Sequence, residues 1–194
     1  MARRIYFAFH YQDVADLRAN VVRNHWRFKE HRQEAGYYDW SLWEEAADKG
    51  PVGLKRLINS GLEGTTVTCV LVGTETYLRP WVRYELLKSF KRGSELLAIH
   101  INMIKGKDQK IKPSGSNPLH HVGVTFSESG ITATLHEKVG GKWRKYSEID
   151  GRASYQVDPV PAQYRGRGFL LGNFFNTYDW VADNGYANFK NWVA

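Results

Sequence analysis

The stretch Thr65-Thr-Val-Thr-Cys-Val-Leu-Val72 is a continuous run of β-branched and apolar residues. Strands with one face in water alternate apolar and polar residues, whereas an unbroken run is typical of a strand covered on both faces. Cys69, the only cysteine of the chain, lies within this run, so we expect a buried thiol and no intrachain disulfide. The run therefore predicts a central strand of a parallel sheet.

Helical patterns flank this strand on both sides. Before it, apolar residues follow helical spacing from Pro51, a residue suited to a first helical turn, to Leu62. After it, the pattern predicts a helix over Pro80–Lys91 with Gly93 as its stop. That helix leads into Leu96–Ile101, a second short apolar strand.

The N-terminal segment adds another strand and helix. Arg4–Phe9 is rich in aromatic and β-branched residues. After Asp13, four apolar residues follow the spacing of one helix: Val14, Leu17, Val21 and Val22. Alternating strands and helices predict right-handed crossovers and a doubly wound α/β sheet. Ligands in such sheets gather at the C-terminal ends of the strands, here Phe9–Asp13, Val72–Tyr77 and Asn102–Lys105.

The pattern changes after residue 105. Lys105–Pro118 is polar and predicts a loop. Three alternating segments follow, separated by turn signals, and predict an antiparallel meander: Val122–Phe126, Ile131–Glu137 and Trp143–Tyr146. We expect Gly151–Gly168 to be irregular and Tyr178–Val193 to form a closing amphipathic helix, which Gly185 weakens.

A single domain is expected over residues 1–194, since this length suits one hydrophobic core. Its core would cover about 1–105, with a β-meander insertion over about 106–170 and the closing helix over about 178–193. The formal charge of +7 is compatible with an anionic partner, but the basic residues are scattered and no recognition motif accompanies them. Nucleic acid is therefore not expected as a partner. No apolar run approaches the roughly 20 residues of a membrane span, and no signal peptide is readable, so we expect a cytoplasmic protein.

Two segments resemble the sequence boxes of TIR domains. Tyr6-Phe-Ala-Phe-His-Tyr-Gln-Asp13 is similar to the first box, in which an aromatic strand runs into Ser or His and then Asp. Trp81-Val-Arg-Tyr-Glu-Leu86 is similar to the later box, in which a Trp stands four residues before a Glu-Leu pair. Further segments resemble the TIR-like proteins of the Thoeris antiphage system: residues 9–14, 21–26, 41–44, 54–59, 67–71, 81–85 and 178–183.

This resemblance implies a flavodoxin-like fold and an enzyme that takes NAD as substrate and needs no cofactor. The enzyme would cleave the N-glycosidic bond of NAD, release nicotinamide and make a cyclic ADP-ribose isomer. That product would activate a separate NAD-consuming effector protein. A phage-derived trigger and a second copy of the chain are further candidate partners. Two alternatives stay open, a non-catalytic TIR scaffold that signals by assembly and a nucleoside N-ribosyl hydrolase or transferase.

The resemblance makes Glu85 the candidate catalytic residue. Departure of nicotinamide leaves an oxocarbenium-like ribose, and a nearby anion stabilises the positive charge that grows in the transition state. Trp81 shares a helix face with Glu85, one turn earlier, and either stacks on a ring of the dinucleotide or belongs to the core.

The other candidate contacts with NAD lie at the predicted strand ends. Phe9, His10 and Tyr11 offer a ring face and polar atoms. His10 is equally readable as a neutral, satisfied imidazole. Asp13, which follows them, suits an N-cap of the first helix better than a ligand contact.

Three more residues complete the predicted binding set. Asp39 and Ser41 occupy the place of the loop that borders TIR pockets, although Asp39 also suits a strand end and Ser41 a helix cap. Thr74, at the end of the central strand, either lines the pocket or acts as a capping residue. The adjacent His120 and His121 point differently on any regular element, so no metal site is expected.

Overall fold

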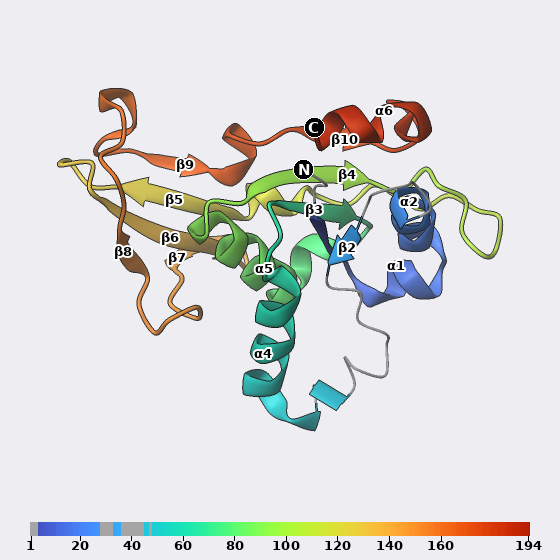
Figure 1. The fold of residues 1–194 in the computed structure, drawn as a ribbon, viewed down its shortest axis with the longest axis horizontal. Helices are drawn as coiled ribbons and strands as arrows, with labels where there is room; N and C mark the ends of the chain where they lie inside the picture. The colour runs from blue at the N-terminus through green and yellow to red at the C-terminus, as the bar shows by residue number, and fades with distance from the viewer. Residues whose placement is uncertain (1–3, 28–32, 36–44, 47) are drawn as a thin grey trace.

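A parallel five-stranded sheet, sheet A, forms the centre of the protein (Figure 1). The computed structural model describes residues 4–27, 33–35, 45–46 and 48–194. Sheet A has the order β10-β4-β3-β1-β2, and all its pairings are parallel. Its strands are β1 (Arg4–Ala8), β2 (Gln33–Ala35), β3 (Val67–Val72), β4 (Glu95–His100) and β10 (Thr177–Asp179). Read from the β2 edge, this is the flavodoxin-like order, so the predicted doubly wound α/β fold is confirmed.

Helices cover both faces of sheet A (Figure 1). On one face α2 (Arg18–Arg27) and α6 (Gly185–Trp192) share a core cluster with Cys69 and its strand neighbours. On the other face α4 (Gly50–Leu62) and α5 (Pro80–Lys91) pack on the alternate strand residues, such as Val70 and Val72. Every residue of β3 is buried, Cys69 included, which confirms the central strand and the buried thiol.

The helix predicted after Asp13 is broken in two. The chain forms α1 (Tyr11–Ala15), and α2 then starts at Arg18. Between them Leu17 has a left-handed backbone with φ of 68°, which is unfavourable for a residue with a Cβ. The break turns the buried Arg18 guanidinium onto the carbonyl oxygens of Ile104 and Lys110, at 3.0 and 2.6 Å. The expectation of one helix was wrong because these distant partners stabilise the break.

A second, antiparallel sheet, sheet B, lies in sequence between β4 and β10 of sheet A. Its strands are β5 (Val122–Phe126), β6 (Thr132–Val139), β7 (Lys142–Lys145), β8 (Ser154–Gln156) and β9 (Gly168–Leu170). The predicted meander is confirmed as β5, β6 and β7, whereas the expectation of irregular structure over Gly151–Gly168 missed β8 and the first residue of β9. Buried residues of sheet B, such as Val124 and Leu135, join the core cluster of α4 and α5. Short 3₁₀ turns complete the described elements: η1 (Thr76–Leu78), η2 (Pro118–His120), η3 (Ala162–Tyr164) and η4 (Leu171–Asn173).

The closing helix is shorter than predicted. Tyr178 lies in β10, the fifth strand of sheet A, and α6 begins only at Gly185. Gly185 is the first residue of this helix rather than a weak point inside it, and a Cβ there would overlap the ring of the buried Trp180, so this position needs glycine. The prediction rested on the spacing of aromatic residues from residue 178 onward. Local spacing does not reveal that residues 177–179 pair with β4.

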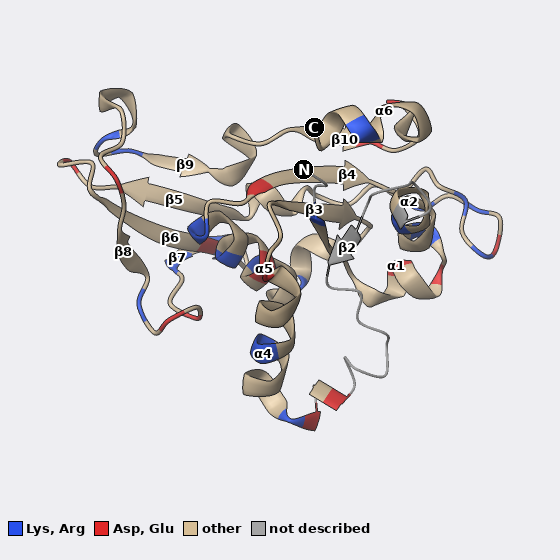
Figure 2. Cartoon of the chain, viewed as in Figure 1, with Lys and Arg blue, Asp and Glu red and all other residues tan. Residues whose placement is uncertain are grey.

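Lys and Arg residues are spread over α4, α5, sheet B and the loop after β4 rather than gathered on one element (Figure 2). None of the helices in the described ranges is long and apolar enough to cross a membrane.

Candidate active site at the ends of β1 and β3

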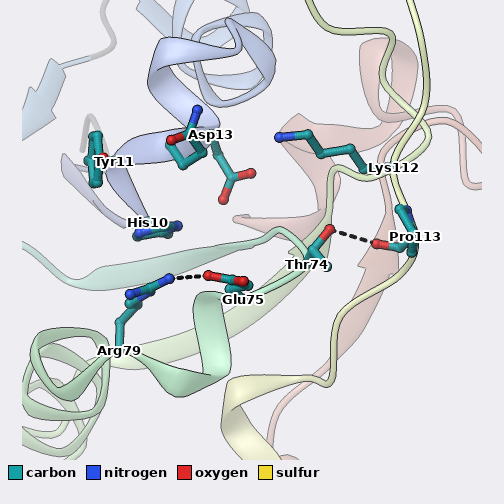
Figure 3. Close-up of a pocket in the computed structure, with 9 residues that line it drawn as sticks. His10, Tyr11, Asp13, Thr74, Glu75, Arg79, Lys112 and Pro113 are labelled. Atoms are coloured by element: carbon teal, nitrogen blue, oxygen red, sulfur yellow. Dashed lines mark hydrogen bonds and ion pairs between the residues drawn. The ribbon is translucent and has the colours of Figure 1, made fainter.

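A cavity of about 530 Å³ opens where β1 and β3 end, beside the loop that follows β4 (Figure 3). It is lined by His10, Tyr11, Gln12, Asp13, Thr74, Glu75, Arg79, Lys112 and Pro113. Three of the predicted contacts, His10, Tyr11 and Thr74, therefore lie together. The Thr74 hydroxyl donates to the Pro113 carbonyl at 2.8 Å, which ties the loop to the end of β3.

Asp13 forms the buried floor of this cavity. It is the third residue of α1, whose N-cap is His10, so the capping interpretation of Asp13 was wrong. Its carboxylate accepts a hydrogen bond of 3.4 Å from Thr76 and lies so close to Gly73 that a Cβ there would overlap it. Burial raises the pKa of Asp13, and the nearby charge of Lys112 opposes that shift. A buried carboxyl that faces a cavity is a chemically competent group.

Two basic side chains, Arg79 and Lys112, line the cavity. Arg79 pairs with Glu75, and Lys112 pairs with Asp16 (Figure 3 shows the first pair). The Arg79 Nε is buried and has no hydrogen-bond partner among the residues that the structure describes. Burial, and then the charge of Arg79, lowers the pKa of His10, so its imidazole is neutral at pH 7. Two carboxyls, those of Asp13 and Glu75, line the same cavity, so its formal charge is balanced, and Arg79 and Lys112 are the groups able to bind an anionic part of a ligand.

Sequence reasoning missed these cations. Arg79 only precedes the proline that begins α5, and Lys112 lies in a segment expected to be a polar loop. No local pattern brings Lys112 to the end of β3. A signal was available for Arg79, because the residue before a predicted helix at a ligand-bearing sheet edge lies close to that edge.

Glu85 belongs to α5, and its buried side chain faces β1. Its side chain is 5% exposed, and the Tyr6 hydroxyl donates a hydrogen bond of 2.5 Å to its Oε1. Burial raises the pKa of Glu85 to about 8, and the Tyr6 hydrogen bond opposes that shift only in part. The carboxyl is therefore mostly protonated at neutral pH, in contrast to the anion expected from the sequence. Glu85 is not among the residues that line the cavity at β1 and β3.

The remaining predicted residues do not gather in this cavity. Trp81 lines a second cavity, described below, where its ring meets Tyr84 edge to face with centroids 6.0 Å apart. Phe9 packs on the α2 side of sheet A, with the Arg23 guanidinium 5.1 Å from its ring centroid. The candidates Asp39 and Ser41 lie outside the described residues. Within the described ranges, no three His, Cys, Asp or Glu side chains are grouped as a metal site would need.

Comparison with known proteins connects this geometry to a family. Residues 6–105 match the family model described as the TIR-like domain of the Thoeris protein ThsB. Over all 194 residues the chain is 47% identical to a protein of Bacillus cereus (strain MSX-D12), and the match covers 100% of both chains. That protein is provisionally named cyclic ADP-D-ribose synthase ThsB1.

Proposed function

From its membership of the Thoeris ThsB family of TIR-like proteins, to which this chain belongs, we propose that it is an NAD-cleaving enzyme that makes a cyclic ADP-ribose signal. The observation that carries this proposal is the full-length identity of 47% with a relative named as a cyclic ADP-D-ribose synthase. The enzyme class is NAD glycohydrolase or ADP-ribosyl cyclase, and its role is signalling in antiphage defence.

We place NAD in the cavity at the ends of β1 and β3. The volume of about 530 Å³ is in the range of small-molecule sites. Arg79 and Lys112 are the two cations that line the cavity, and we expect them to bind the negatively charged diphosphate of NAD. His10 and Tyr11, whose rings lie edge to face with centroids 5.1 Å apart, are left to contact the nicotinamide riboside.

We assign Glu85 as the catalytic carboxyl. In the reaction the bond between ribose C1′ and the nicotinamide nitrogen breaks, and its electron pair leaves with nicotinamide. The ribose becomes cationic at C1′ until an oxygen or nitrogen nucleophile attacks it and releases a proton. An ionised Glu85 stabilises the cation and can take up that proton. With a pKa of about 8, roughly a tenth of the carboxyl is ionised at pH 7.

The burial of Glu85 makes activation part of this proposal. The Tyr6 hydroxyl occupies Oε1, and the carboxyl does not line the cavity that would hold NAD. Catalysis therefore requires a rearrangement that brings the other carboxyl oxygen, Oε2, to the ribose while the Tyr6 hydroxyl stays bonded to Oε1. A phage-derived trigger is the expected cause of that change, and the cyclic product is expected to act on a separate NAD-consuming effector.

The test compares wild type with Glu85→Gln after phage infection, following NAD loss, nicotinamide release and the cyclic product together. We expect Glu85→Gln to abolish all three. The matched control is Glu63→Gln, the same change at an exposed carboxyl beyond α4, which should retain activity. Full turnover by Glu85→Gln would remove the residue from the mechanism. A triggered wild type that signals without releasing nicotinamide would favour the scaffold, and cleavage of nucleosides instead of NAD would favour the N-ribosyl hydrolase.

A further inference from the structure

A second cavity, of about 510 Å³, lies between the two helices α4 and α5 and sheet B. Its lining is Pro51, Lys55, Pro80, Trp81, Arg83, Tyr84, Glu137, Arg144, Lys145, Tyr146, Ser147 and Glu148. None of these residues lines the cavity at β1 and β3. Half of them come from residues 137–148, beyond the 6–105 range of the family match, so sheet B and the segment that follows β7 contribute half of this site.

Charge is the first property of this cleft. Four basic side chains and two carboxylates line it, which leaves a surplus of two positive charges. Both oxygens of the buried Glu137 are already used, one by Arg83 at 2.8 Å and the other by Arg144 at 2.8 Å. Glu148 is paired with Lys55 at 3.1 Å. The surplus therefore rests on Lys145, which is exposed and makes no ion pair with any described residue, and on the 63% exposed Arg144.

Ring surface is the second property. The half-buried Trp81 lines the cleft beside the buried Tyr84 and Tyr146. Planar aromatic ligands bind by stacking or edge contacts on such rings, and arginine adds a cation on or beside the ring plane. Arg144 directs its Nε and Nη2 to Oε1 of Glu137, both at 2.8 Å, which fixes its position on β7 and leaves Nη1 for an anionic group.

We propose that this cleft is a second nucleotide-binding site, separate from the substrate cavity. Its ligand is a phosphorylated purine nucleotide of the adenosine diphosphate class, with the phosphates at Arg144 and Lys145 and the base near Trp81. The assignment does not depend on Glu85 or on turnover. Sheet B supplies Arg144 and Lys145, and α5 supplies Trp81. A bound nucleotide would therefore contact both sheet B and α5, the helix that carries Glu85.

The experiment is calorimetric titration of the full chain with ADP, with inorganic phosphate as a parallel probe. Wild type is compared with Lys145→Glu and with Lys142→Glu, which reverses the same charge on β7 outside the cleft. Loss of one charge-assisted contact should weaken ADP binding about tenfold in Lys145→Glu. Lys142→Glu should bind ADP like wild type, and phosphate should bind more weakly than ADP. Lys112→Glu, in the substrate cavity, should leave the affinity of the cleft for ADP unchanged, because the two cavities share no lining residue; ADP that binds the substrate cavity forms a separate phase that depends on Lys112.

Three results would overturn the proposal. One is the absence of ADP binding at millimolar concentration, and another is equal binding by wild type and Lys145→Glu. The third is weaker binding in Lys112→Glu alone, which would place ADP in the substrate cavity. Trp81→Leu gives an independent check, since it should weaken ADP binding and leave phosphate binding intact. The titrations need no catalysis, so inactivity of the protein toward NAD would leave their result readable.

Discussion

Removal of one hydroxyl, in Tyr6→Phe, tests how the environment of Glu85 sets its chemistry. The hydroxyl donates 2.5 Å to Oε1 and favours the ionised carboxyl, which opposes the effect of burial on the pKa. A hydrogen bond to a charged group is worth about 1.5–3 kcal/mol, and one pKa unit corresponds to about 1.4 kcal/mol. Taking the lower end of that range, Tyr6→Phe should raise the pKa of Glu85 by about one unit above its value of about 8.

The assay is the pH profile of NAD cleavage by triggered protein. The acidic limb of the variant should move up by about one pH unit, so activity at pH 7 should fall about tenfold and return at high pH. A loss of equal size at every pH would show that the hydroxyl only maintains packing. An unchanged profile would refute the claim that the Tyr6 hydrogen bond tunes the carboxyl.

Three further predictions follow from the same structure. Because the pKa of Glu85 is raised from its ordinary value of 4.5 to about 8, the stability that its protonated form contributes is lost as pH rises through that window. The Tm of Glu85→Gln relative to wild type should therefore increase between pH 5 and pH 8, and a constant difference would contradict the raised pKa. Lys112→Glu should raise the KM for NAD about tenfold with little change in kcat, whereas Lys110→Glu, in the same loop but outside the cavity, should not. Glu137→Gln should lower the free energy of unfolding by about 3 kcal/mol in urea titration, because the buried Arg83 loses its carboxylate; an unchanged midpoint would show that water replaces the lost partner.

Local sequence patterns were sufficient for the elements with strong local signals. The unbroken run of β3 identified the centre of the sheet, and Pro80 with Gly93 marked the limits of α5. These signals act through the conformational preferences of nearby residues, so they can be read without the fold. The alternating segments of sheet B were visible for the same reason.

Features that depend on contacts between residues far apart in the chain could not be predicted from local sequence patterns. The break before α2 depends on contacts of Arg18 with carbonyls 86 and 92 residues away. The protonation of Glu85 depends on Tyr6, 79 residues earlier, and on burial that no local pattern reveals. The family resemblance identified Glu85 but not its environment. Likewise, Lys112 joins the candidate site only because the loop after β4 returns to the end of β3.

The sequence of sheet B interrupts the sequence of sheet A, between β4 and β10. This affects the order in which the strands of sheet A can pair during synthesis on the ribosome. Once β4 has emerged, one edge of this strand stays open until β10, which pairs with it from residue 177 onward, is also made. During that interval the entire antiparallel sheet is synthesised, while β4 exposes unpaired backbone groups that invite association with other chains. A nascent chain stalled between the two strands is therefore a natural substrate for chaperones that shield open sheet edges.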